Sequence, residues 1–279
     1  PLFYLRRAGF AGKVVVITGS TRGIGRAMAE ACAAEGATVV VSSRTASAVD
    51  ETVAALVAAG GSASGIPCDV TTLGDLEALL AHAIETHGRV DVWVNNAGMS
   101  LGMRRHVDTA PDEDELIVRT NLLSVMNGSR IAVRYFVERG GGVLVNVSGR
   151  GGRGDASAYT AAYAATKAGV MVFTKSLAAE HKSDPVTIVA FMPGMVETDF
   201  YGESMQVGPG LEPMVGTLRV VLDAIGTPIG MVGPKLVEVA CTTPGEDSGK
   251  VCDVNSSARM MRGGMKLAWA RMTGRLKGL

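Results

Sequence analysis

The sequence lacks several features that would assign it to a class at once. Its 279 residues carry 27 Lys and Arg against 27 Asp and Glu, so it has no net charge and no overall basic field for nucleic acid. Aromatic residues make up only 5% of it, which argues against a surface of stacked aromatics for nucleic acid. The cysteines are few and far apart, and we expect neither a disulfide scaffold nor a metal site: Cys32, Cys68, Cys241 and Cys252.

Long apolar runs are also missing, and none is long and clean enough to cross a bilayer. In residues 1–7 the charges follow the apolar residues, the reverse of a secretory signal, so a cytoplasmic location is the simplest expectation. The chain is instead rich in apolar residues, 47%, and in glycine, 36 residues. It can therefore bury a large core, and its length suits one large α/β domain.

Apolar runs and helical stretches alternate along the first 200 residues or so. The predicted strands cover residues 14–17, 37–42, 66–70, 90–95, 143–147 and 187–191. The predicted helices cover residues 24–35, 47–59, 73–86, 113–138 and 159–180. This alternation predicts a single doubly wound Rossmann-fold domain over residues 1–258, with a parallel sheet flanked by helices. The segment 195–217 is rich in Gly, Pro and Met, and this composition predicts a substrate loop.

The turn after the first predicted strand, residues 18–25, reads TGSTRGIG. Its glycines, Gly19, Gly23 and Gly25, let the backbone turn tightly and approach a pyrophosphate, while the following helix points its N-terminal N–H groups at the anion. A plain glycine-rich turn is the alternative. The position between a strand and a helix is what a dinucleotide-binding loop requires.

Three further motifs follow in register: NNAG at residues 95–98, YxxxK at 163–167 and PG at 193–194. With these four motifs the sequence resembles the short-chain dehydrogenase/reductase family over about residues 11–200. More loosely, the glycine-arginine loop 149–154 and the basic tail resemble its chlorophyll(ide) b reductase branch. The family resemblance implies a nicotinamide cofactor, a small-molecule carbonyl or alcohol substrate, and a homodimer or homotetramer assembled through the two long helices.

The choice of cofactor depends on the end of the second strand. Ser42 and Ser43 lead into Arg44 with no acidic residue, and Arg22 lies in the glycine loop. Two guanidinium groups can hold a 2′-phosphate, so we expect NADP(H); an NAD-dependent alcohol dehydrogenase with solvated arginines is the alternative. The predicted cofactor-binding residues are Gly19, Ser20, Thr21, Arg22, Gly23, Ile24, Gly25, Arg44, Asp69, Val70, Asn95, Ala97, Gly98, Tyr163, Lys167, Pro193, Gly194, Val196 and Thr198.

The predicted chemistry depends on Tyr163 and Lys167, which are four apart on a predicted helix and share a face. A nearby ammonium lowers the pKa of a tyrosine from its usual value of about 10, which suits the phenol to general acid/base work. The resemblance also gives Lys167 the nicotinamide ribose and gives Asn121 a proton relay through water to Lys167. Tyr159 lies two helical turns from Lys167 and is too distant to compete.

The serine that polarises the substrate carbonyl in this family is matched less well. Ser148 follows the fifth strand but lies fifteen positions before Tyr163, further than the family usually has it, because of the loop 149–154. We predict Ser148 for this role, with a turn-capping serine as the alternative. The displacement also leaves open a non-catalytic nucleotide-sensing protein, against which Tyr163, Lys167 and Asn121 argue.

Two basic regions have two interpretations each. Arginines and a histidine in the predicted substrate loops either bind a carboxylate or phosphate or are solvated, and we favour the second: Arg104, Arg105, His106, Arg150 and Arg153. The tail 259–279 has basic residues and no acid, with Met261, Met265, Ala268, Met272 and Leu276 at helical spacing. This basic amphipathic helix lies on an anionic membrane surface or covers a neighbouring subunit.

Overall fold

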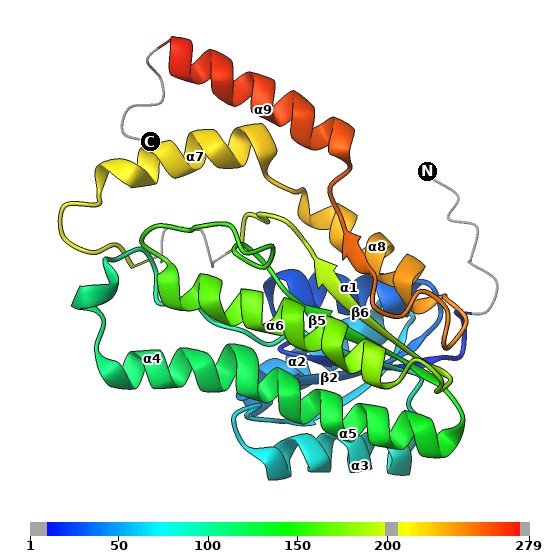
Figure 1. Ribbon diagram of the computed structural model, residues 1–279. Coiled ribbons are helices and arrows are strands. Elements are labelled where there is room, and N and C mark those ends of the chain that lie inside the picture. Colours follow the sequence, from blue (N-terminus) through cyan, green and yellow to red (C-terminus); the bar gives the residue numbers. More distant parts are fainter. Residues whose placement is uncertain (1–9, 199–205, 274–279) are drawn as a thin grey trace.

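The structure, a computed structural model, describes residues 10–198 and 206–273. In this part of the chain one parallel seven-stranded sheet forms, in the order β3-β2-β1-β4-β5-β6-β7 (Figure 1). The strands are β1 (Val14–Thr18), β2 (Thr38–Ser43), β3 (Ser62–Pro67), β4 (Val92–Asn95), β5 (Gly142–Val147), β6 (Val186–Met192) and β7 (Val251–Asp253). The strand order reverses between β1 and β4, so a ligand crevice is expected at the carboxyl ends of these strands. The predicted Rossmann fold is confirmed.

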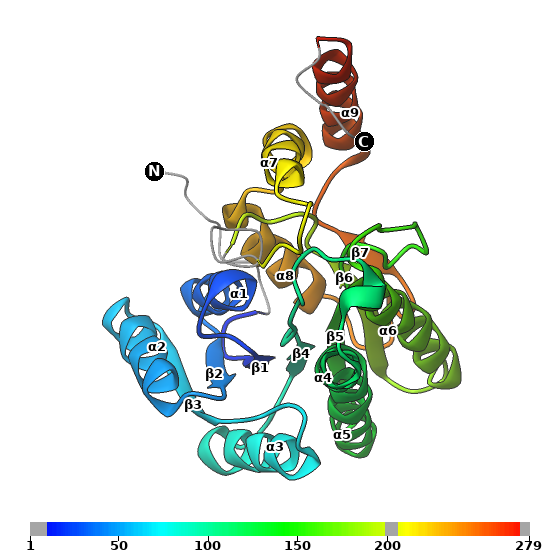
Figure 2. The ribbon, with the colours of Figure 1, turned by 90° about the vertical axis from the view of Figure 1, so that its left-hand side faces the viewer.

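Helices cover both faces of the sheet, as Figure 2 shows along its edge. One face carries α1 (Gly23–Ala34), α2 (Ala46–Ala58) and α8 (Val232–Ala240), and the other carries α3 (Leu73–His87), α5 (Ser124–Arg139) and α6 (Ala161–Glu180). Alternate residues of β1 enter the two cores: Val15 and Ile17 pack with α1, and Val14 and Val16 with α3 and α5. Burial on both sides explains why β1 is a continuous apolar run.

The third strand lies earlier than predicted. Pairing with β2 begins at Ser62 and ends at Pro67, whereas the sequence pattern predicted residues 66–70. An edge strand needs less apolar surface than an inner strand, so β3 consists of small and polar residues apart from Ile66 and Pro67, and it gives no strand pattern. Pro67 is tolerated because it sits at the end of an edge strand.

The predicted helix 113–138 begins at Pro111 and is divided in two. It comprises α4 (Pro111–Val118), the π-helical turn η2 (Arg119–Leu123) and α5. The predicted helix 159–180 begins two residues late, as α6. Tyr159 adopts a φ of 64°, which is incompatible with a right-handed helix, so this residue lies outside α6.

The last third of the chain adds two long helices beyond the sheet layers, α7 (Pro213–Ile225) and α9 (Ser257–Met272) (Figure 1). Short 3₁₀ turns are η1 (His106–Asp108) and η3 (Ile229–Met231). The predicted loop 195–217 is wrong over residues 213–217, because Pro213 opens α7, where a proline suits the first turn. Residues 199–205 of that loop, and Leu276 of the predicted tail helix, lie outside the described residues. None of the helices described is long and apolar enough to cross a membrane.

Candidate active site

The glycine loop joins β1 to α1 and packs against the end of β4. Gly19 has a φ of 64°, and a Cβ built on it would lie 2.9 Å from the Ala97 Cα. A Cβ built on Gly25 would overlap the Gly19 carbonyl oxygen. Any side chain at these two positions would therefore push the loop apart, and the bare backbone is left to line the crevice.

Two polar side chains outside the predicted set hold this loop in place. The Thr18 hydroxyl accepts from the backbone N–H of Asn96 at 3.0 Å and from that of Ala97 at 3.1 Å. The Asn96 amide donates to the carbonyls of Thr18 at 2.9 Å and Gly19 at 3.1 Å. Both residues belong to the TG and NNAG motifs, so the motifs themselves were the signal for them.

Two predicted cofactor residues direct their side chains into the protein. The Ser20 hydroxyl is buried and donates to the Ile17 carbonyl at 2.7 Å. Asn95 is buried as well; its amide oxygen accepts from the Trp93 indole at 2.8 Å, and its NH₂ donates to Asn146 at 2.8 Å. Only the backbone of Ser20 and Asn95 is left for a ligand, because their side chains tie strand ends together.

The remaining predicted residues at the adenosine end gather around β1 and β2. Arg22 is the residue just before α1, ahead of Ile24, and Arg44 follows the last residue of β2; both arginines are exposed. Because Thr18 of β1 pairs with Ser42 of β2, these two ends lie side by side. After β3, the Asp69 carboxylate accepts from the Thr71 N–H at 2.9 Å, and Val70 is buried.

The segment after β6 crosses back toward the glycine loop. Gly194 has a φ of 80°, and a Cβ there would overlap Thr227 Oγ1 and Asn255 Nδ2, which are joined by a 2.7 Å hydrogen bond. Further along, the Thr198 methyl group lies 3.6 Å from a Cβ built on Gly23. The described end of this segment, from Pro193 through Val196 to Thr198, thus approaches the loop that starts α1.

Lys167 is the buried cation of the site. Its side chain comes from α6, only 3% of the residue is exposed, and Nζ lies 5.7 Å from the centroid of the Tyr163 ring. Nζ donates to the Val147 carbonyl at the end of β5, at 3.1 Å. Burial lowers the pKa of Lys167 to about 8, because the ammonium form loses its hydration.

Asn121 lies in the π-helical turn and is held by the loop after β4. Its Oδ1 accepts from the Met99 N–H at 2.8 Å, and its Nδ2 donates to the Met99 carbonyl at 2.9 Å and to Thr166 Oγ1 at 3.3 Å. A Cβ built on Gly98 would lie 3.3 Å from Asn121 Oδ1 and 3.5 Å from Lys167 Nζ. The fold therefore brings Gly98, Asn121 and Lys167 to one point, and Thr166 supports them from within the YxxxK motif.

The Ser148 hydroxyl is bonded to a backbone carbonyl of α6. Ser148 is 2% exposed and donates to the backbone carbonyl of Lys167 at 2.9 Å, while a Cβ built on Gly152 would overlap its Oγ. The residue that faces the tyrosine is Gly149, where a built Cβ would lie 2.7 Å from Tyr163 Oη. Ser148 is thus bonded to the backbone of α6, and Gly149 is the neighbouring residue that lies beside the phenol.

Replacing Gly149 by Ala is expected to displace the Tyr163 hydroxyl, since the new methyl group has no room. A misplacement of about 1 Å can cost on the order of 10²-fold in rate, so kcat should fall by roughly that factor. Steady-state kinetics of the variant would measure it. Gly74→Ala is the matched control, because a Cβ at Gly74 meets nothing within 4 Å. Equal activity of the two variants would contradict this geometry.

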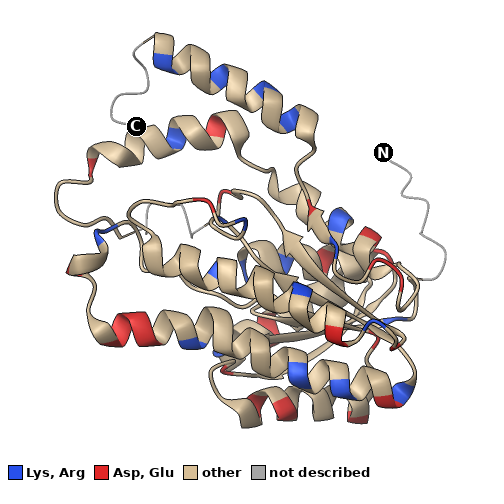
Figure 3. Ribbon diagram, in the orientation of Figure 1, with Lys and Arg blue, Asp and Glu red and all other residues tan. Residues whose placement is uncertain are grey.

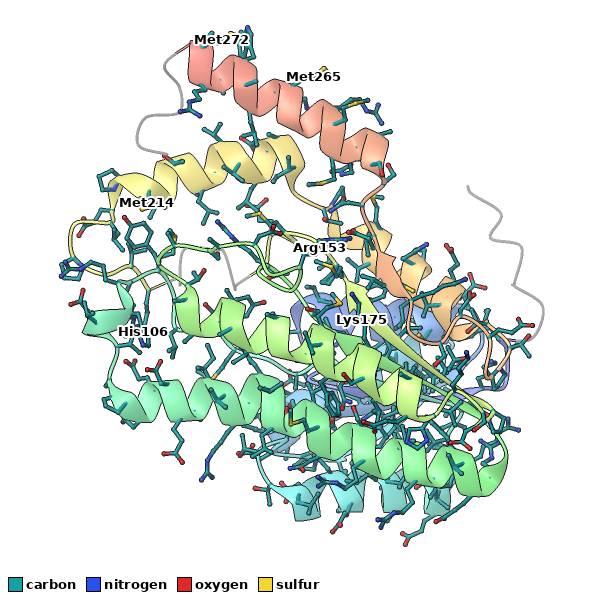
Figure 4. All side chains as sticks on the ribbon, in the orientation of Figure 1. His106, Arg153, Lys175, Met214, Met265 and Met272 are labelled. Atoms are coloured by element: carbon teal, nitrogen blue, oxygen red, sulfur yellow. The ribbon has the colours of Figure 1, made fainter. Side chains whose placement is uncertain are left out.

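The loop cations mostly face carboxylates. Arg104 pairs with Glu113 at 3.0 Å, Arg105 with Asp108 at 3.0 Å, and Arg153 with Asp253 at 3.0 Å. Figure 4 shows His106 beside α4 and Arg153 on the far side of α6, so they do not converge. These pairs give no support to a cluster that would bind an anionic substrate.

The chain belongs to the short-chain dehydrogenase/reductase family. The short chain dehydrogenase profile matches residues 13–206, which include the glycine loop, Asn121, Tyr163 and Lys167. Members of this family are oxidoreductases that bind NAD or NADP.

Three relatives and one solved structure place the chain within the family. It is 38% identical to "Ketoacyl reductase HetN" of Nostoc sp. over 66% of this chain and 64% of that protein. It is 34% identical to "3beta-hydroxysteroid dehydrogenase 1" of Eggerthella lenta over 92% of this chain and 94% of that protein. It is 38% identical to "Chlorophyll(ide) b reductase NOL, chloroplastic" of Arabidopsis thaliana over 66% of this chain and 55% of that protein, which supports the looser branch resemblance. An actinorhodin polyketide ketoreductase solved with NADPH superimposes with a TM-score of 0.76 at 30% identity, over 87% of this chain and 95% of that one.

Proposed function

We propose that this chain is an NADP(H)-dependent oxidoreductase that interconverts a ketone and a secondary alcohol. The observation that supports this proposal best is the buried Lys167 ammonium, which lies 5.7 Å from the Tyr163 ring where the ends of β4 and β5 meet. The names of the ketoacyl reductase, the polyketide ketoreductase and the hydroxysteroid dehydrogenase are all consistent with this reaction. Reduction is the proposed direction, because NADPH usually serves as a reductant.

The close packing of Gly19 and Gly25 makes a bare backbone cradle that fits a dinucleotide, whose nicotinamide would supply or accept the hydride when bound. Gly19 to Gly25 would hold its pyrophosphate, and the other predicted cofactor residues would line its two halves. Tyr163 would donate a proton to the ketone oxygen, or take it back from the alcohol, as general acid/base. Lys167 would stabilise negative charge on the tyrosine oxygen and hold the ribose, and Asn121 would position the loop after β4 for a proton relay to Lys167.

Ser148 has a different role in this proposal. Its hydroxyl donates to the Lys167 carbonyl, while Lys167 Nζ donates to the carbonyl of Val147, the residue before Ser148. One bond runs from the end of β5 to α6 and the other from α6 to the end of β5. Together they fix the position of Lys167 relative to the end of β5. We therefore assign Ser148 as a positioning residue. With Gly149 opposite the phenol, Tyr163 is the protein hydroxyl that we place at the ketone oxygen.

The proposed preference for NADPH rests on Arg22 and Arg44, which follow the adjacent ends of β1 and β2 in the chain. Arg22→Ala with Arg44→Ala should raise the KM for NADPH about 10²- to 10⁴-fold, since two charge-assisted hydrogen bonds to a phosphate are lost and each is worth about 1.5–3 kcal/mol. The KM for NADH should stay unchanged. Cofactor oxidation with a panel of ketones measures both. Arg130→Ala is the control, because Arg130 is an exposed arginine on α5.

Two outcomes would contradict this proposal. Tighter binding of NADH than of NADPH by the unaltered protein would show that the arginines do not meet a 2′-phosphate. If no ketone led to oxidation of the cofactor, the proposed reaction would be contradicted. We further propose a homodimer or homotetramer built on α4, η2, α5 and α6, whose outer sides carry exposed apolar residues: Leu116, Val118, Leu123, Val137 and Val172.

A further inference from the structure

Helix α9 packs on α7 through its smallest residues. Gly263 and Ala270 are its buried positions, and a Cβ built on Gly263 would overlap Ile225 Cγ2 and lie 2.7 Å from the Ala224 carbonyl oxygen. Arg259, on the same side, donates to the Gly226 carbonyl. The contact with α7 is therefore close where Gly263 meets Ala224 and Ile225.

Most of the large apolar residues of α9 lie on the opposite side, while Leu267, at helical spacing from Gly263 and Ala270, is half-buried. Figure 4 shows the labelled Met265 and Met272 on the side of the helix away from α7. Four residues three or four positions apart form this methionine stripe, with the exposed fractions Met261 67%, Met265 59%, Trp269 52% and Met272 79%. A helix that only covered its own protein would turn this stripe inward. The stripe is thus directed at something outside the protein.

The charge of α9 indicates what kind of surface the methionine stripe contacts. The helix carries Arg259, Arg262, Lys266 and Arg271 and no acidic residue, and Figure 3 shows it as the outermost helix with blue positions alone. At 3.6 residues per turn, Arg262 and Lys266 border the stripe on one side and Arg271 on the other. An apolar stripe with a tryptophan, flanked by cations, is typical of helices that lie in the headgroup region of a bilayer. A two-fold contact between copies through this stripe would instead bring their cationic borders together.

We propose that α9 is an interfacial helix, and that its methionine stripe enters the surface of an anionic membrane while its cations meet the lipid phosphates. No spanning helix is involved, and the catalytic domain would sit on the bilayer with α7 between it and α9. Each cation at an anionic surface contributes about 1 kcal/mol, or about fivefold in partition.

Co-sedimentation with vesicles tests this, using phosphatidylcholine alone and phosphatidylcholine mixed with phosphatidylglycerol. The full chain should bind the mixed vesicles and lose binding at high salt. Arg262→Gln, Lys266→Gln and Arg271→Gln together should weaken partition on the order of 100-fold. Met261→Gln, Met265→Gln and Met272→Gln together should abolish it. Val57→Gln with Val107→Gln, two exposed apolar residues outside α9, is the control that should bind normally.

Tryptophan emission gives a second readout on the same samples. The chain has two tryptophans, Trp93 is buried, and Trp269 lies on the stripe, so a blue shift with anionic vesicles reports insertion of α9. Absence of binding to the mixed vesicles, or equal binding by the methionine variant, would overturn the proposal. So would a stripe-dependent dimer that ignores vesicles, because the stripe would then be a contact between copies. Vesicle binding needs no turnover, so these outcomes are independent of the proposed reaction.

Discussion

Tyr163→Phe is expected to lower kcat for ketone reduction by about 10²–10⁴-fold, the range that a positioned general acid contributes. The phenol is the hydroxyl that we place at the ketone oxygen, and Gly149, not a serine, is the residue whose built Cβ would meet it. The change removes one oxygen atom and keeps the ring beside Lys167. NADPH binding should therefore persist, and the KM for NADPH should change little.

Tyr159→Phe is the matched control for this experiment. Tyr159 precedes α6 with a φ of 64° and lies outside the helix that carries the pair. Stopped-flow measurement of NADPH oxidation, with NADPH affinity from fluorescence titration, separates chemistry from binding. A Tyr163→Phe enzyme that keeps normal turnover, or a Tyr159→Phe enzyme that loses it, would refute the assignment of the general acid.

Lys167→Met is expected to reduce kcat by roughly the same factor and, unlike Tyr163→Phe, to weaken cofactor binding. The ammonium is 5.7 Å from the tyrosine ring and is the cation that we place at the ribose. Because burial lowers the pKa of Lys167 to about 8, the unaltered enzyme should lose reductive kcat/KM as the pH rises above about 8 and the lysine becomes neutral. The variant should lack this limb of the pH profile.

The same substitution should stabilise the fold at neutral pH. The pKa of Lys167 is about 8 in the folded protein and 10.5 for a free lysine, so below pH 8 both states hold the proton and folding bears the whole cost of burying it. That cost is at most about 3 kcal/mol and disappears between pH 8 and 10.5 as the folded state releases the proton first. The lost hydrogen bond to Val147 offsets about 1 kcal/mol of the gain.

Urea unfolding at several pH values measures this difference. The gain of Lys167→Met over the unaltered protein should be largest near pH 7 and shrink above pH 8. Lys175→Met serves as the control, because Lys175 lies on the same helix but is exposed (Figure 4). A Lys167→Met protein that is less stable than the unaltered protein at pH 7 would show that the ammonium is not a burden to the fold.

Much of the site was predictable because its motifs are local. The glycine loop and the Tyr163–Lys167 pair depend on spacings within one turn or one helix, which the sequence displays directly. The direction of Ser148 was not predictable. Successive residues at a strand end point to opposite sides, so whether Ser148 or Gly149 faces Tyr163 depends on the path of the loop 149–154.

The elements that escaped prediction depend on tertiary contacts. Strand β3 forms from mostly small and polar residues because β2 supplies its partner and the sheet edge requires little burial. The period of α9 was visible in the sequence, and the helix is confirmed over Ser257–Met272. The direction of its stripe was not visible, because it is set by the fit of Gly263 and Ala270 against α7.

The π-helical turn η2 changes how the side chains of the long helix around it are distributed. A π-helical turn contains more residues than an α-helical turn. The side chains of α5 are therefore rotated about the helix axis from the directions that an unbroken α-helix continuing α4 would give them, by about 100° for each inserted residue. A single helical wheel drawn through both halves would assign one of them to the wrong face. Deleting one residue between Arg119 and Leu123 would restore an even α-helix and rotate Asn121 away from Met99. The irregularity thus lets α5 pack on the sheet while Asn121, in the turn itself, is turned toward Met99 in the loop after β4.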